Sequence, residues 1–148
     1  YIKRLIGLPG DVIQIIDGDF YLNGEKILKE RIEGSFTANC GDVVVDVDLY
    51  EETLSNGKKY LASYFTHGSM KNSDKFTVPK NHYFFLGDNR DCSKDSRFLT
   101  SVGYVNINNF VGKARIIFFS NEKKHGSLFT PWKWNRSIRF SRMFNEIK

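Results

Sequence analysis

The stretch HYFFLGDNRDCSKDSR, residues 82–97, joins a short apolar run to eleven residues that have almost nothing to bury. The run 82–86 has the length and aromatic content of a buried strand. The loop after it alternates acidic, basic and hydroxyl side chains at a spacing that can close a local network of charge-assisted hydrogen bonds. Taken alone, this loop fits an ordinary surface turn and the scaffold of a functional site equally well.

The composition indicates a folded protein that is mostly β. The chain has 148 residues, of which 41% are apolar and 15% aromatic. Val, Ile, Phe and Tyr recur in short bursts broken by Gly, Asn and Asp, which is typical of strands joined by tight turns. No run of about eighteen apolar residues occurs within the sequence, so we expect no bilayer-spanning segment in it. The net charge of +5 suits an anionic membrane surface or a nucleic acid but requires neither.

Turn signals predict how several strands pair. Asp17-Gly18 and Asn23-Gly24 are strong hairpin dipeptides, and they predict an antiparallel meander between residues 12 and 29. Apolar and acidic residues alternate over 43–49, and we expect this half-solvated strand to pair with 59–65. The middle of the chain is therefore also predicted to be β-rich.

The chain offers little for metal or disulfide chemistry at the level of sequence. Cys40 and Cys92 are too few for a disulfide framework, and the sequence does not decide whether they pair. The three histidines have no carboxylate or cysteine at ligand spacing, so we expect no metal. Because no glycine-rich phosphate loop is present either, we expect no cofactor.

A second motif, YIKRLIGLPGD, occupies residues 1–11. Lys3-Arg4 followed by GLPGD resembles the lysine-bearing box of type I signal peptidases, the membrane-bound Ser-Lys endopeptidases that remove leader sequences. Residues 87–97 resemble the last box of the same family. Both motifs are long and occur in the family's order, with a strand-rich interval between them. The resemblance is clear over 1–16 and 77–120 and weak in between.

The resemblance implies a signal-peptidase-like fold: antiparallel sheets that form a partly open barrel. We expect a single catalytic domain over residues 1–148. It divides into a barrel core with the motifs (1–16 and 76–121), an inserted β-rich excursion (17–75) and a basic aromatic tail (122–148).

Two features of the C-terminal part carry further expectations. Residues 110–120 are the longest strand candidate, and their apolar second half favours burial. The tail carries Trp132 and Trp134. Three arginines follow at intervals of three: Arg136, Arg139 and Arg142. A helix would place them on one stripe that suits a membrane surface, whereas a packed tail would solvate them.

Lys3 is the residue to which the resemblance assigns the chemistry. A lysine acts as a general base only when neutral, and its ordinary pKa of about 10.4 forbids this near pH 7. Burial in an apolar wall disfavours the ammonium form. Lys3 lies between Ile2 and Leu5 on an expected strand and can sit in such a wall, whereas Arg4 points to the other face. The resemblance implies that Lys3 is the general base and Arg4 a structural companion; otherwise Lys3 is an edge-strand lysine that prevents aggregation.

The last box supplies the residues that the resemblance assigns to support. Ser93 matches the serine that hydrogen-bonds the lysine and orients it. Asp95 and Arg97 match a salt bridge that buttresses the site, the fork geometry expected for holding a loop in one conformation. We expect Asp88 and Arg90 to shape the turn.

The family's nucleophile is a serine followed by methionine, located before the lysine box. The sequence starts two residues before Lys3, so we expect this chain to lack that serine and to be inactive alone. Part of the oxyanion hole, which uses the backbone N–H of the nucleophile, would be missing with it. Ser69-Met70 has the right dipeptide, but it follows the lysine in a polar loop and lacks the proline-containing continuation.

The function implied is that of a membrane-associated serine endopeptidase that removes signal peptides from exported preproteins by a Ser-Lys dyad. The extended substrate would add a strand beside the site. The implied location is the bacterial cytoplasmic (inner) membrane, with phospholipid as a partner and the domain on the periplasmic, extracytoplasmic face.

Three alternatives stay open at this point. One is a self-cleaving, repressor-type Ser-Lys protease domain, and another is a non-catalytic homologue that only holds signal peptides. The third is a β-barrel that binds single-stranded nucleic acid through exposed aromatics. Aromatic and basic residues are not interleaved on the longest strand candidate, so we expect no nucleic-acid partner.

Overall fold

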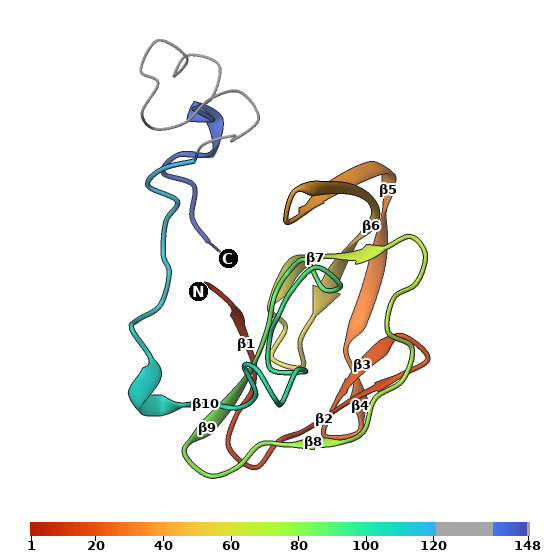
Figure 1. The fold of residues 1–148 in the computed structure, drawn as a ribbon, viewed down its shortest axis with the longest axis vertical. Coiled ribbons are helices and arrows are strands. Elements are labelled where there is room, and N and C mark those ends of the chain that lie inside the picture. The colour runs from red at the N-terminus through yellow and green to blue at the C-terminus, as the bar shows by residue number, and fades with distance from the viewer. Residues whose placement is uncertain (121–137, 148) are drawn as a thin grey trace. The chain divides into compact units, whose positions relative to one another are not determined.

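The computed structural model describes residues 1–120 and 138–147, and its regular structure is almost entirely β (Figure 1). By its contacts the chain divides into two compact units, Tyr1–Phe110 and Val111–Lys148. The first unit contains strands β1 to β10 and both sequence motifs. In the part of the chain described, no helix is long and apolar enough to cross a membrane. A single catalytic domain over 1–148 stays a prediction.

Three antiparallel sheets make up the first unit, with strand orders β1-β9-β10, β4-β3-β2-β8 and β5-β6-β7. The mostly β class with antiparallel sheets is confirmed, and the sheets formed by the described residues do not close into a complete barrel. The strands are β1 (Arg4–Gly7), β2 (Val12–Ile16), β3 (Asp19–Leu22), β4 (Glu25–Lys26), β5 (Leu28–Cys40), β6 (Val43–Thr53), β7 (Lys59–Phe65), β8 (Phe76–Thr77), β9 (His82–Leu86) and β10 (Val105–Asn106). In residues 1–120 and 138–147, the 3-10 turns η1 (Ile107–Asn109) and η4 (Phe140–Arg142) follow.

The two hairpin dipeptides form the turns that their sequences predict. Asp17 and Gly18 have φ values of 50° and 81°, and Asn23 and Gly24 have 54° and 83°. Positive φ at both central residues matches the right-handed twist of the flanking strands. The resulting pairs β2–β3 and β3–β4 confirm the predicted meander, although its third strand ends at Lys26 and β5 begins two residues later.

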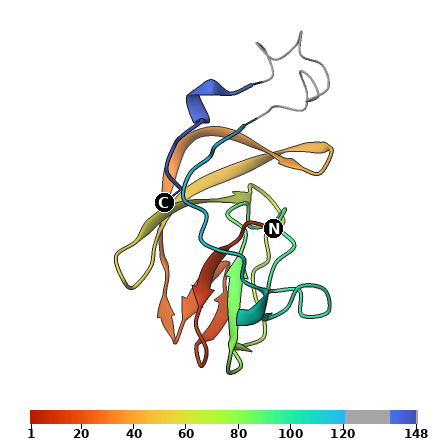
Figure 2. The same ribbon diagram turned by 90° about the vertical axis from the view of Figure 1, so that its left-hand side faces the viewer.

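The third sheet is built on the long β5–β6 ribbon, which Figures 1 and 2 show in orange and gold. The predicted pairing of 43–49 with 59–65 is confirmed only for residues 47–49: β6 and β7 are antiparallel, with Val47 opposite Phe65 and Thr53 opposite Lys59, whereas residues 43–46 pair with β5. The preceding strand β5 was not predicted. Its sequence is mostly polar and carries a register shift between Ile32 and Phe36, so no alternation marks it as a strand.

One hydrophobic core joins the sheets of the first unit. It contains buried residues of β1, β2, β3, β7, β8 and β9, among them Ile13 and Phe84 at 0% exposure. The segment predicted as an excursion contributes directly to this core: Phe20, Ile27, Tyr60, Ala62 and Tyr64. Residues 17–75 are therefore packed against the strands that carry both motifs.

The pairing of β1 with β9 decides where the two motifs meet. The strands are antiparallel, with Arg4 opposite Leu86 and Leu5 opposite Phe85. In an antiparallel pair, the residue before one strand lies beside the residue after the other. Lys3, just before β1, is thus brought to Gly87, just after β9. The glycine at position 7 allows close packing here, since a Cβ on Gly7 would lie 2.6 Å from Ile13 Cδ1.

The prediction of a long strand over 110–120 is wrong. This segment makes one isolated bridge, between Ile116 and Glu146, and Phe118 is 75% exposed. Phe144, in the facing segment, has a φ of 64°, which interrupts the extended backbone that a continuous ladder needs. In the described tail, residues 140–142 form only the turn η4; Trp132, Trp134 and Arg136 lie outside the described residues.

Candidate active site

Lys3 and Ser93 are in direct contact. Lys3 Nζ donates a hydrogen bond to Ser93 Oγ at 2.6 Å, across 90 positions of sequence. Ser93 is buried and Lys3 is half-buried. The expected apolar wall of Ile2 and Leu5 is wrong, because β1 begins only at Arg4 and Ile2 is 76% exposed. A hydroxyl orients the amine without adding a charge, and in this structure that hydroxyl belongs to Ser93.

Arg4 anchors the start of the last-box loop, residues 87–97. Its Nε and Nη2 donate to the two carboxylate oxygens of Asp88 at 2.7 and 2.9 Å, a bidentate pair. The guanidinium also lies over the ring of Tyr60, 4.1 Å from the ring centroid. A two-bond fork fixes orientation as well as distance. Arg4, which follows Lys3 in the chain, therefore holds the turn after β9 in place beside the start of β1.

Asp95 and Arg97 form the second brace of this loop, and both are buried. Asp95 accepts hydrogen bonds from Arg97 Nε and Nη2, each at 2.8 Å, and from the Gly87 amide at 3.0 Å. Burial by itself raises the pKa of the Asp95 carboxyl, but the hydrogen bond and charge of Arg97 hold that pKa below its ordinary value. Asp95 therefore stays ionised, and Arg97 also donates to the carbonyl oxygen of Arg90.

Gly87 is a site residue that reading the sequence missed. A Cβ at this position would lie 2.0 Å from Ser93 Oγ and 3.1 Å from Lys3 Nζ. The motif contains Gly87, but nothing in a single sequence distinguishes a turn glycine from one that leaves room for a neighbouring side chain. Here the missing side chain is the space in which Ser93 and Lys3 meet.

Four buried side chains form a cluster where the loop contacts β6 and β7. Arg90, which the sequence placed in the turn, contacts three residues of β6 and β7 that sequence reading did not select: Glu52, Tyr60 and Tyr64. A glutamate within an alternating strand carries no signal of burial, so only the folded chain identifies it.

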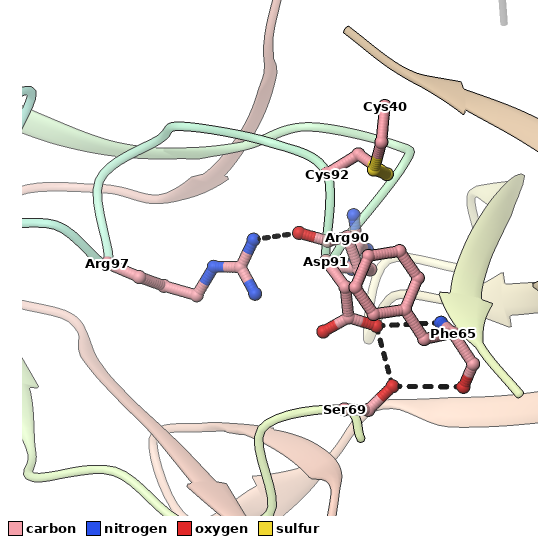
Figure 3. Close-up of a disulfide and its surroundings, with 7 residues drawn as sticks. All are labelled: Cys40, Phe65, Ser69, Arg90, Asp91, Cys92 and Arg97. Atoms are coloured by element: carbon pink, nitrogen blue, oxygen red, sulfur yellow. Dashed lines mark hydrogen bonds between the residues drawn. A yellow bond between two sulfur atoms is a disulfide. The ribbon is translucent and has the colours of Figure 1, made fainter. Parts of the chain in front are cut away.

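A disulfide links the loop to the end of β5. Cys40 and Cys92 are bonded, with a Cα–Cα distance of 5.2 Å (Figure 3). Next to it, Asp91 Oδ2 accepts from the Phe65 amide at 2.8 Å and from Ser69 Oγ at 2.6 Å. Ser69, which with Met70 forms the same dipeptide as the family's nucleophile, thus donates a hydrogen bond to Asp91 in a structural contact between β7 and the loop.

Reducing the Cys40–Cys92 bond is expected to lower the free energy of unfolding by about 2–4 kcal/mol. The bond spans 52 positions, so its loss restores conformational freedom to a long loop of the unfolded chain. Denaturant unfolding with and without reductant measures the difference. The double variant Cys40→Ser/Cys92→Ser is the control and should show no response to reductant; equal stability of the oxidised and reduced wild type would contradict the expectation.

Comparison with known proteins gives this geometry its context. A family model described as signal peptidase, peptidase S26, matches residues 1–119. Signal peptidase I of Rickettsia bellii (strain OSU 85-389) is 41% identical over 163 residues, covering 99% of this chain and 54% of that protein. Signal peptidase I of Rickettsia akari (strain Hartford) is 41% identical over 162 residues, covering 99% and 59%. The chain spans about half the length of the curated relatives it matches.

A solved signal peptidase I from Enterococcus faecalis V583 aligns with a TM-score of 0.38 and 26% sequence identity, covering 74% of this chain and 78% of that one. A TM-score this low does not establish a common fold, so the assignment rests on the sequence matches. They place the chain among the peptidases. Within that class, it belongs to the signal peptidase family, peptidase S26, as its two motifs predicted.

Proposed function

We propose that this chain is the catalytic β domain of a membrane-associated serine endopeptidase that removes signal peptides from exported preproteins. The observation that carries the proposal is the 2.6 Å hydrogen bond between Lys3 and Ser93. An isolated surface lysine has no need of a buried hydroxyl partner, whereas a lysine that accepts a proton must be oriented toward the proton donor. The ion pairs Arg4–Asp88 and Asp95–Arg97 hold the loop that carries Ser93, and so keep the orientation of the Lys3 amine fixed.

In the proposed mechanism, the neutral amine of Lys3 removes the proton from a serine hydroxyl as that oxygen bonds to the scissile carbonyl carbon. The resulting ammonium gives its proton to the leaving amine, and an acyl-enzyme ester remains. Water then attacks the ester while Lys3 again accepts a proton and returns it to the serine. We propose that this serine comes from a part of the protein outside residues 1–148, so the chain alone is inactive.

The proposed location is the extracytoplasmic face of the bacterial inner membrane, with phospholipid and exported preproteins as partners. The Cys40–Cys92 bond supports this location, because disulfides persist in oxidising compartments and are rare in the cytosol. An extended substrate segment would bind as an added strand beside the site. The family match favours this reading over the repressor-type and nucleic-acid alternatives.

Cleavage of an exported preprotein by the whole protein in phospholipid vesicles tests the proposal. We expect one cut, identified by mass spectrometry of both products, directly after a small residue at the end of the signal peptide. The matched control is the same preprotein with that small residue replaced by phenylalanine, which should stay intact. A folded protein that leaves both preproteins uncut would overturn the proposed function.

A further inference from the structure

Two buried charges join the last-box loop to the β5-β6-β7 sheet. Glu52 of β6 and Arg90 of the loop are each 1% exposed, and Arg90 Nη2 donates to Glu52 Oε2 at 2.5 Å. Tyr60 Oη donates to the same oxygen at 2.7 Å, and Tyr64 Oη donates to Glu52 Oε1. Both carboxylate oxygens of Glu52 are therefore held by donors from β7 and the loop.

The chemistry of this cluster keeps its geometry fixed. Burial and the charge of Glu52 raise the pKa values of Tyr60 and Tyr64, so both phenols remain hydrogen-bond donors. Burial alone would lower the pKa of Arg90, but Glu52 raises it. A buried ion pair adds little net stability, because desolvation of two charges offsets their attraction. What such a pair does is penalise any structure in which one partner is lost or displaced.

Arg90 carries this constraint to the Lys3 site. Its Nη1 donates to the carbonyl oxygen of Gly87 at 2.7 Å, while the Gly87 amide donates to Asp95 Oδ2 at 3.0 Å. Gly87 is thus held on both sides of its peptide backbone. Because its Cα borders the space shared by Ser93 and Lys3, the position of Gly87 limits where the Ser93 hydroxyl can lie.

The same turn is also seated on β7 through its backbone. The Ser63 amide donates to the Asp88 carbonyl at 2.8 Å, and the Arg90 amide donates to the Ser63 carbonyl at 2.8 Å, forming a parallel bridge. Glu52 therefore binds the side chain of Arg90, whose backbone already pairs with β7. Residues 17–75, which were predicted only as an inserted excursion, therefore contain the strands that support the loop.

We infer that Glu52 is a positioning residue for Lys3, acting through Arg90 and Gly87; this inference rests on the proposed function, in which Lys3 is the base. Without the Glu52 carboxylate, the Arg90 guanidinium is a buried charge with no counter-charge in this cluster. It then shifts toward solvent and releases the Gly87 carbonyl, so that Ser93 no longer fixes the amine. Because Glu52 touches neither substrate nor reacting atoms, its loss acts on kcat and leaves KM unchanged.

The first test compares Glu52→Gln with Glu51→Gln in the whole protein. Glu51 is the preceding residue of β6, points to the opposite face and pairs with Lys59 on the surface, so its variant is a matched control. We expect Glu52→Gln to lower kcat for preprotein cleavage by about 10- to 100-fold with KM unchanged, the size associated with misplacing a catalytic group by about 1 Å. Glu51→Gln should cleave like the wild type. Wild-type kcat in Glu52→Gln would overturn the inference.

A second variant separates positioning from charge balance. Glu52→Leu/Arg90→Met removes both charges and fills the site with apolar side chains, a change that buried pairs often tolerate. If Glu52 serves only to neutralise Arg90, this double variant regains activity, and the inference is overturned. If it acts through the Arg90–Gly87 hydrogen bond, the double variant melts near the wild-type temperature but keeps the low kcat.

Amide hydrogen exchange provides a readout that does not depend on activity. In Glu52→Gln, the amides of residues 87–95 should exchange faster, while those of β2 and β3 keep their wild-type rates. Exchange that rises equally in all strands would mean a general loss of stability and would overturn the inference. If the wild type itself cleaves no preprotein, the proposed function fails, and exchange at Gly87 still decides whether Glu52 holds the loop.

Discussion

Replacing Lys3 by alanine in the whole protein is expected to lower kcat for signal-peptide cleavage by about 10⁴-fold. The alanine side chain cannot accept the proton of the attacking serine, and the hydrogen bond to Ser93 is lost with it. Lys3 lies ahead of β1 and is only half-buried, so its removal leaves the core intact. The change should therefore appear in the rate and not in the melting temperature.

Lys94 provides the matched control for this prediction. It is an exposed lysine of the last-box loop, next to Ser93, and has no role in the proposed proton transfer. Lys94→Ala removes the same charge from the same neighbourhood and should cleave at the wild-type rate. Equal losses in both variants would mean that overall charge near the loop, and not a specific amine, supports the reaction.

Replacing Gly87 by alanine is expected to lower kcat by about 100-fold. The new Cβ would lie 2.0 Å from Ser93 Oγ and 2.4 Å from Ser93 Cβ, distances at which a Cβ clashes with any non-bonded heavy atom. Ser93 must move, and the amine of Lys3 moves out of line with it. Steady-state kinetics of preprotein cleavage measure the loss, with far-ultraviolet circular dichroism as the check on folding.

Gly112→Ala is the control for that substitution. Among the described residues, a Cβ on Gly112 meets nothing within 4 Å, and its φ lies outside the positive region, so alanine is compatible with the backbone there. This variant should retain wild-type kcat. Wild-type activity in Gly87→Ala would contradict the close approach of Gly87 to Ser93 and Lys3.

The sequence predicted those parts of the fold that depend on local chemistry. Asp17-Gly18 and Asn23-Gly24 adopt the positive φ values that such dipeptides favour, and their hairpins formed as predicted. Residues 47–49 of the alternating segment 43–49 paired with the predicted partner strand. Short-range conformational preference was sufficient in each of these cases.

The failures concern pairings that the rest of the chain decides. The strand β5 is polar along most of its length and is held in place by its partner β6, not by its own pattern. Residues 110–120 have the composition of a strand, but the facing segment turns at Phe144 and offers no continuous ladder. Strand propensity alone does not supply the hydrogen-bonding partner that a strand needs.

The candidate site shows the same division. The motifs named Lys3, Ser93 and the Asp95–Arg97 pair, because these residues lie within recognisable stretches. The Glu52–Arg90 hydrogen bond joins residues 38 positions apart, and the Cys40–Cys92 bond joins residues 52 positions apart. No local pattern marks either contact. Only the packing of the β5-β6-β7 sheet under the loop brings these groups together.

The most direct test of Lys3 as the base is the rate of preprotein cleavage by the whole protein carrying Lys3→Arg. Arginine keeps a positive charge and can donate to Ser93, but its guanidinium does not release a proton under physiological conditions. If a neutral amine at position 3 is required, the variant melts like the wild type and cleaves about 10⁴-fold more slowly, as Lys3→Ala does. Cleavage by Lys3→Arg at the wild-type rate would contradict the assignment of Lys3 as the general base.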